Sequence, residues 1–179
     1  MEFLKYHALG NDYLVLTSKI IKSPEDILES HLVKRICNRN FGLGSDGILV
    51  SGKKDSNSIF SLHIFNPDGS IAEKSGNGVR IFVRSLWDRK LIKGSDVKIK
   101  TLGGILKAQI NDTGQTVTVE MGKVNFLKED NSKPRKKISS SNERLEINNE
   151  KLTICTASIG NPHCVVLNRK ISPEETKIF

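Results

Sequence analysis

Apolar and polar residues alternate with a period of two along most of the chain, which is typical of strands that bury one face. Strand patterns lie at residues 3–7, 13–17, 48–50, 59–66, 97–101, 105–110, 116–121, 152–158 and 164–167. Glycine-containing turns separate the three segments between residues 97 and 121. These three segments therefore predict an antiparallel meander.

Two further segments have helical spacing instead. The first has a cap and a helix-starting proline at Ser23-Pro24, continues through Leu28 and ends near residue 40. The second covers residues 79–90, and Ser75 with the three residues after it opens it. Residues 128–149 are charged and rich in serine, which predicts an irregular connection. Many short strands with only two helices predict an α+β fold rather than a wound parallel sheet.

Composition and charge narrow the class of protein. The chain has 179 residues, of which 37% are hydrophobic and 27% charged, values typical of a globular protein. A net charge of +8 could attract nucleic acid, but the densest basic cluster, residues 133–137, has no aromatic residues for base stacking. No segment approaches the roughly 20 apolar residues of a membrane span. We therefore expect no nucleic acid and no membrane as partner, and a non-catalytic basic binding module stays as an alternative.

The cysteines indicate the redox compartment. Cys37, Cys155 and Cys164 are odd in number and form no CxxC pair. The first five residues, Met1-Glu2-Phe3-Leu4-Lys5, lack the apolar core of a signal peptide. These features predict free thiols in a reducing cytoplasm.

Residues 42–47 have the glycine spacing of a dinucleotide-binding loop. Such a loop follows a strand and opens a helix, so that the pyrophosphate of the cofactor meets the helix N-terminus. In this chain a predicted helix comes before the glycines and a predicted strand after them. We therefore interpret them as a tight turn and reject a dinucleotide site.

The segment Ser75-Gly76-Asn77-Gly78 opens the second predicted helix. The first amides of a helix have no partner within it, so they form a ready site for a carboxylate or a phosphate. A cysteine at position 75 would have a lowered pKa there and could act as a base. Taken alone, these four residues favour a plain serine cap.

A second polar segment, Gly160-Asn161-Pro162-His163-Cys164, lies between two predicted strands. Proline holds Asn161 in an extended conformation, and His163 could shuttle protons near neutral pH. A simple polar turn is the alternative. A metal site is disfavoured, because adjacent residues of a strand point to opposite faces.

Five motifs occur in order along the chain. They are His7-Ala8-Leu9-Gly10-Asn11-Asp12-Tyr13, Asn38-Arg39-Asn40-Phe41-Gly42-Leu43-Gly44-Ser45-Asp46-Gly47, Ile64-Phe65-Asn66-Pro67-Asp68-Gly69-Ser70, Glu73-Lys74-Ser75-Gly76-Asn77-Gly78-Val79-Arg80 and Ser158-Ile159-Gly160-Asn161-Pro162-His163-Cys164. In this order they resemble the diaminopimelate epimerases as far as about residue 170. The resemblance implies two similar halves, each a set of antiparallel strands wrapped around a central helix. Residues 1–122 would form the N-terminal half, and residues 123–179 would begin the second.

The resemblance also implies a function. Diaminopimelate epimerases are isomerases that interconvert L,L- and meso-diaminopimelate on the route to lysine and cell-wall precursors, without pyridoxal phosphate or metal. One thiolate removes the α-proton, and a second thiol returns a proton on the opposite face. Position 75 would be catalytic, and His163 would help to set the protonation of the catalytic pair. The residues expected to bind this small amino-acid substrate are Asn11, Asn66, Gly76, Asn77 and Asn161.

Two departures from the family pattern matter. Ser75 stands where the family has its first catalytic cysteine, and an alkoxide is far harder to form than a thiolate. A racemase or dehydratase acting on another amino acid is therefore an alternative. The second catalytic cysteine and a glutamate–arginine pair have no counterpart in these 179 residues, so we do not expect the chain alone to epimerise. A homodimer remains open.

Overall fold

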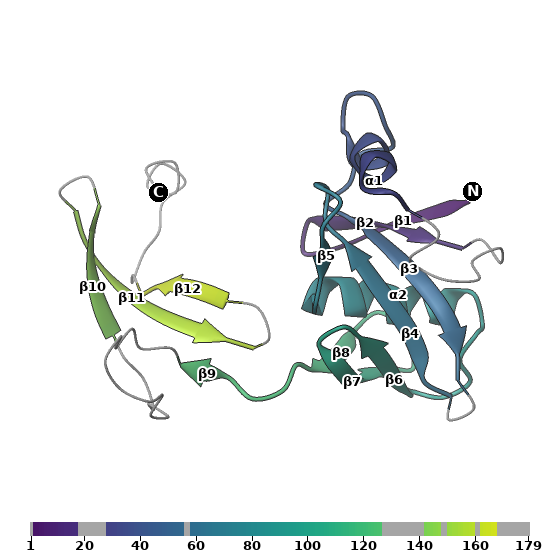
Figure 1. Cartoon of the computed structure of the whole chain (residues 1–179). Helices are drawn as coiled ribbons and strands as arrows, with labels where there is room; N and C mark the ends of the chain where they lie inside the picture. Colours follow the sequence, from purple (N-terminus) through teal and green to yellow (C-terminus); the bar gives the residue numbers. More distant parts are fainter. Residues whose placement is uncertain are drawn as a thin grey trace. The chain divides into compact units, whose positions relative to one another are not determined.

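The computed structural model describes residues 2–17, 28–55, 58–126, 142–147, 150–159 and 162–167. The chain forms two compact units, Met1–Met121 and Gly122–Phe179 (Figure 1). Within the described residues, no helix is long and apolar enough to cross a membrane.

The first unit contains one mixed sheet. Its strands are β1 (Phe3–Ala8), β2 (Asn11–Leu16), β3 (Ile48–Lys54), β4 (Phe60–Phe65), β5 (Ile71–Ala72), β6 (Asp96–Thr101), β7 (Gly104–Ile110) and β8 (Val117–Glu120). The order is β1-β2-β3-β4-β6-β7-β8, with β5 paired to β4. The pairs β2–β3 and β4–β6 are parallel and the others are antiparallel.

Helix α2 (Gly76–Asp88) supplies the centre of this unit. Its buried residues Val79, Phe82, Val83 and Leu86 share one apolar cluster with buried residues of five strands, from Val15 on β2 to Ile110 on β7. The helix contacts β1 and β2 at one end of the strand order and β7 and β8 at the other. The sheet therefore curls around α2, as Figure 1 shows.

Helix α1 (Ser30–Cys37) packs on the opposite face of the same sheet. Successive residues of a strand point to opposite faces, so β2 serves both clusters. Tyr13 and Val15 face α2, whereas Leu14 and Leu16 pack with Val33 of α1. This division explains the run of apolar residues in β2, which is buried on both sides.

The second unit contains a sheet centred on β11 (Glu150–Ser158). Its partners, all antiparallel, are β9 (Asn125–Phe126), β10 (Asn142–Ile147) and β12 (Pro162–Val166). Leu152, Ile154 and Ala157 of β11 are buried. Leu152 and Ile154 alternate with more exposed neighbours as predicted for a half-buried strand, whereas Ala157 lies on the opposite face.

The predicted α+β class, two helices and meander of β6, β7 and β8 are confirmed. The expected course of the first helix through Leu28 is wrong, because Glu29 is extended (φ −57°, ψ 141°) and α1 begins at Ser30. The cap predicted at Ser23-Pro24 lies outside the described residues. The irregular connection predicted for 128–149 is wrong at β10, where pairing with β11 makes a strand of a weakly patterned segment.

The turn between β1 and β2 holds a non-glycine residue in the left-handed region. Ala8 pairs with Asn11, and Leu9 (φ 56°) and Gly10 (φ 86°) lie between them. Positive φ at both central residues is the requirement of a type I′ turn, for which Asn-Gly is favoured. Leu9 is 91% exposed, so its side chain gains little from packing. The turn therefore carries conformational strain at the start of β2.

We expect Leu9→Asn to raise the free energy of unfolding by about 1 kcal/mol, because asparagine tolerates the left-handed conformation better than leucine. Urea unfolding followed by circular dichroism measures the change. Leu102→Asn is the matched control, since Leu102 is also exposed (63%) in a two-residue turn but lacks a positive φ. Equal effects of the two changes would contradict the explanation.

Candidate substrate-binding site

The site is organised around the first turn of α2. Ser75 is its N-cap, with an extended backbone (φ −146°, ψ 115°), and its Oγ accepts a hydrogen bond of 3.0 Å from the backbone N–H of Gly78. A Cβ at position 78 would lie 3.2 Å from side-chain atoms of Leu49 and Ser75. The cap interpretation of Ser75 is therefore confirmed, and glycine at 78 lets the turn sit close to β3.

A chain of side-chain amides runs beside this turn. Nδ2 of Asn77 donates to Oδ1 of Asn11 at 3.1 Å, and Nδ2 of Asn11 donates to a carboxylate oxygen of Asp46 at 2.9 Å. At the other end, the guanidinium of Arg80 donates to Oδ1 of Asn77. Residues from β2, α2 and the loop before β3 are thus joined in one hydrogen-bonded series.

The charged ends of this series set the orientation of both amides. A carboxylate only accepts and a guanidinium only donates, whereas an asparagine amide can do either. Asp46 therefore selects the NH₂ group of Asn11, and Arg80 selects the oxygen of Asn77. With both oxygens occupied, each amide has one further N–H to offer. The free N–H groups of Asn11 and Asn77 consequently make this site a hydrogen-bond donor toward a ligand.

A donor-rich surface at a helix N-terminus suits an anionic oxygen ligand. The backbone amides of Gly76 and Asn77 belong to the first turn of α2 and have no carbonyl partner within the helix. The helix dipole adds partial positive charge at the same end. A carboxylate could accept from these groups together, as the sequence predicted for this segment.

An ion-pair network fixes Asp46, the hydrogen-bond acceptor for Asn11. Arg39 contacts Asp12 at 2.6 Å and Asp46 at 2.7 Å, and Lys5 contacts Asp12 at 3.0 Å. The side chain of Asp12 is only 13% exposed. Hydrogen bonding from Arg39, helped by Lys5, holds the pKa of the Asp12 carboxyl well below its usual range.

The other expected site residues lie elsewhere. Asn66 stands in the turn after β4, where its Nδ2 donates to Oγ of Ser70 at 2.9 Å, and within the described residues it shares no hydrogen bond with Asn11. His163 is exposed on β12 in the second unit. Asn161 lies outside the described residues. The described part of the chain therefore brings together Asn11, Ser75 and Asn77 with Gly76.

Sequence reasoning did not single out Tyr13, Arg39, Asp46 and Arg80. All four stand inside the quoted motifs, so their positions beside the candidate residues were a usable signal. Their hydrogen bonds span up to 62 positions of sequence, the distance from Tyr13 to Ser75. Such partners become visible only in the folded chain.

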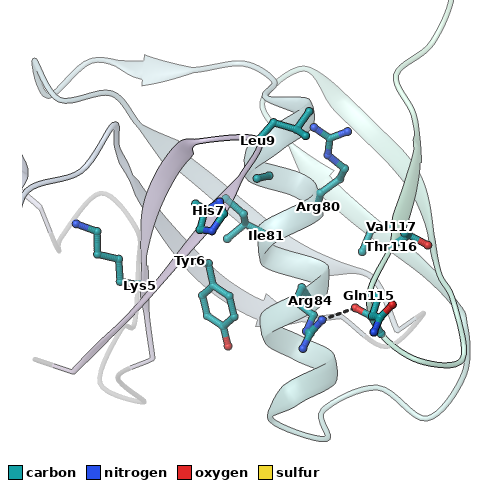
Figure 2. Close-up of a pocket in the computed structure, with 12 residues that line it drawn as sticks. Lys5, Tyr6, His7, Leu9, Arg80, Ile81, Arg84, Gln115, Thr116 and Val117 are labelled. Carbon is teal, nitrogen blue, oxygen red and sulfur yellow. Dashed lines mark hydrogen bonds between the residues drawn. The ribbon is translucent and has the colours of Figure 1, made fainter.

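A pocket of about 570 Å³ lies along the flank of α2, between β1 and the turn from β7 to β8 (Figure 2). Its lining includes Lys5, Arg80 and Arg84. Lys5 is ion-paired with Asp12 and Arg84 with Asp88, whereas Arg80 donates to the neutral amide oxygen of Asn77. Of these three lining cations, Arg80 is therefore the one whose charge is not offset by an ion pair among the described residues.

The fold is shared with solved structures of amino-acid racemases and related proteins. A hydroxyproline epimerase from Agrobacterium vitis aligns with a TM-score of 0.63 over 92% of this chain and 50% of its own, at 18% identity. A phenazine biosynthesis protein from Bacillus anthracis aligns with a TM-score of 0.57 over 93% and 56%, at 20% identity. At these identities the likeness shows the fold alone.

Sequence comparison identifies the family within that fold. The diaminopimelate epimerase profile matches residues 3–127. Diaminopimelate epimerase 2 of Nostoc sp. is 48% identical over all 179 residues, and the enzyme of Moorella thermoacetica is 34% identical over 92% of the chain. The chain belongs to the diaminopimelate epimerase family. It spans 62% and 59% of the length of these two relatives.

We expect Asp12→Asn to lower the free energy of unfolding at pH 7. The folded-state pKa of Asp12 is depressed, so its ionised form stabilises the fold above the unfolded-state pKa of about 3.9, and this contribution is lost as pH falls toward the folded-state value. Urea unfolding at several pH values should therefore show the two curves converging below about pH 4.

Asp112→Asn provides the control, because Asp112 is an exposed aspartate in the turn between β7 and β8. It should change stability little at any pH. A deficit of Asp12→Asn that persisted undiminished to about pH 2 would contradict the assignment of the stabilisation to the ionised carboxylate.

Proposed function

We propose that this chain carries the substrate-binding face of an amino-acid epimerase that interconverts L,L- and meso-diaminopimelate. The amide series of Asn11 and Asn77, oriented by Asp46 and Arg80 at the N-terminus of α2, is the observation that carries the proposal. The names of the relatives supply the substrate. The product would serve lysine and cell-wall precursor synthesis.

Donor groups have a specific use in α-proton transfer. When a base removes the α-proton, the electron pair of the C–H bond is left on the α-carbon and spreads into the adjacent carboxylate. Hydrogen-bond donors aimed at that carboxylate stabilise the added charge. An acid then delivers a proton to the opposite face, which inverts the centre. We propose that Asn77 and Gly76, helped by the helix dipole, bind this carboxylate.

Ser75 stands at the position from which one proton would move. A serine hydroxyl ionises with much more difficulty than a thiol, so Ser75 is a poor base, although it can donate a hydrogen bond. We therefore propose that the 179-residue chain binds diaminopimelate without inverting it. As the family resemblance implies, His163 is proposed to help set the protonation of the catalytic pair and Asn161 to bind substrate.

Ser75 also motivates the second candidate function, a racemase or dehydratase for another amino acid. One-sided chemistry needs a single competent proton-transfer group. Loss of water from a hydroxylated amino acid, with no exchange of the α-hydrogen of diaminopimelate, would favour this candidate. The relatives at 48% and 34% identity favour the first.

Titration calorimetry with diaminopimelate tests the binding proposal. We expect Asn77→Ala to weaken binding by roughly tenfold or more, since a hydrogen bond to a charged group is lost. Asn111→Ala is the matched control, because Asn111 lies away from the N-terminus of α2. It stands in the turn from β7 to β8, in which the Gly114 carbonyl accepts from Arg84 in the later part of α2. 1,5-Diaminopentane, which keeps both amines but lacks the carboxylates, should not bind. Equal binding by Asn77→Ala would contradict the donor assignment.

Hydrogen exchange at the α-carbon in deuterated water tests the catalytic position. We expect the unaltered chain to exchange slowly or not at all, and Ser75→Cys to exchange roughly tenfold faster or more, because a thiolate is a competent base. The product is followed by NMR. Ser95→Cys introduces a thiol elsewhere and should have no effect. An equal rate for Ser75→Cys and the unaltered chain would show that position 75 moves no proton.

A further inference from the structure

A tyrosine hydroxyl lies against the side chain of Ser75. Tyr13 is on β2, 62 positions before Ser75, and its Oη is 3.2 Å from Oγ of Ser75. The residue is 6% exposed and belongs to the apolar cluster around α2. Among the described residues, Ser75 is the hydrogen-bond partner that the structure records for this hydroxyl.

The ring of Tyr13 reaches this position because residue 47 is glycine. A Cβ at Gly47 would lie 2.7 Å from Cε1 and 3.1 Å from Cδ1 of Tyr13, closer than carbon atoms approach without strain. Gly47 in turn is held by its carbonyl, which accepts from the backbone N–H of Leu14 at 3.0 Å and from Oγ of Ser45 at 2.9 Å. The Tyr13 ring therefore packs between Gly47 in the loop before β3 and the apolar cluster that surrounds α2.

Counting donors and acceptors gives the direction of the Tyr13–Ser75 bond. A serine hydroxyl has one proton and two acceptor positions, and Gly78 N–H occupies one acceptor position. The buried phenol needs an acceptor for its own proton, and Ser75 Oγ is the one in reach. A phenol is also a stronger hydrogen-bond donor than an aliphatic alcohol. The bond therefore runs from Tyr13 to Ser75.

With both acceptor positions filled, the proton of Ser75 is left to point away from Tyr13 and Gly78. We propose that Tyr13 is a positioning residue for the side chain at position 75, which it orients and supplies with a second hydrogen bond from the core. A phenylalanine would keep the packing and lose this bond. The consequence for catalysis rests on the proposed function, whereas the contact itself does not.

The same geometry predicts an effect on a thiol at this position. Two donors, Gly78 N–H and the Tyr13 hydroxyl, would stabilise the thiolate of a Ser75→Cys variant over the thiol. Loss of the Tyr13 donor should therefore make that thiol harder to ionise. The protonation of a thiol can be measured without any substrate, so the test is independent of which amino acid the protein binds.

The experiment compares Ser75→Cys with the double variant Ser75→Cys/Tyr13→Phe. The rate of iodoacetamide alkylation at position 75 is measured against pH, and peptide-resolved mass spectrometry separates this thiol from Cys37, Cys155 and Cys164. We expect the double variant to have a thiol pKa higher by about one unit, which is a roughly tenfold lower rate below the pKa. Circular dichroism checks the fold of each variant.

Tyr6→Phe in the Ser75→Cys background is the matched control. Tyr6 is the cross-strand partner of Tyr13, but its hydroxyl donates to Asp88 rather than to position 75. This change should leave the thiol pKa where it was. The same pKa with tyrosine or phenylalanine at position 13, or an equal shift from Tyr6→Phe, would overturn the proposal.

A second measurement leaves Tyr13 unaltered, so it stands even if Tyr13→Phe does not fold. NMR of the unaltered chain is expected to show the Tyr13 hydroxyl proton in slow exchange with water, and Ser75→Ala to speed this exchange at least several-fold. An unchanged exchange rate would overturn the proposal. Failure of diaminopimelate to bind would sink the proposed function and leave this result in place.

Discussion

Burial of α2 inside the curled sheet is the constraint on which the rest of the first unit depends. A 13-residue helix that packs apolar side chains against buried residues of five strands cannot shift without opening the core. Its N-terminus is therefore held in place. The same packing fixes the backbone of Ser75, Gly76 and Asn77. Rigid elements hold binding groups more reproducibly than loops do, because their backbone is already ordered before a ligand arrives.

Two charged side chains then determine which hydrogen-bonding groups the asparagine amides at this N-terminus present. An asparagine amide has no intrinsic preference for presenting its oxygen or its nitrogen, so two of them in contact could adopt several patterns. Asp46 at one end and Arg80 at the other leave one pattern that satisfies every partner. The ion pairs of Arg39 with Asp12 and Asp46 keep the acidic end in place.

Serine at position 75 changes the chemistry of the site more than its shape. Oγ of Ser75 caps the helix through Gly78 and meets the Tyr13 hydroxyl, so the contacts of the position are made. What serine lacks is acidity, because an alcohol is intrinsically far harder to ionise than a thiol. The packing contacts of the residue at position 75 and its ability to transfer a proton are thus separable.

The local pattern of the sequence determined the strands, the α+β class and the cap at Ser75, because each depends on residues close together in the chain. The five ordered motifs indicated the family. Only the tertiary structure decided the start of α1 at Ser30 and the strand β10, since neighbouring elements override weak local preference. It also decided which partners orient Asn11 and Asn77 and which ring reaches Ser75. Those contacts join residues tens of positions apart, and nothing in the spacing of a sequence reports which side chains the folded core will press together.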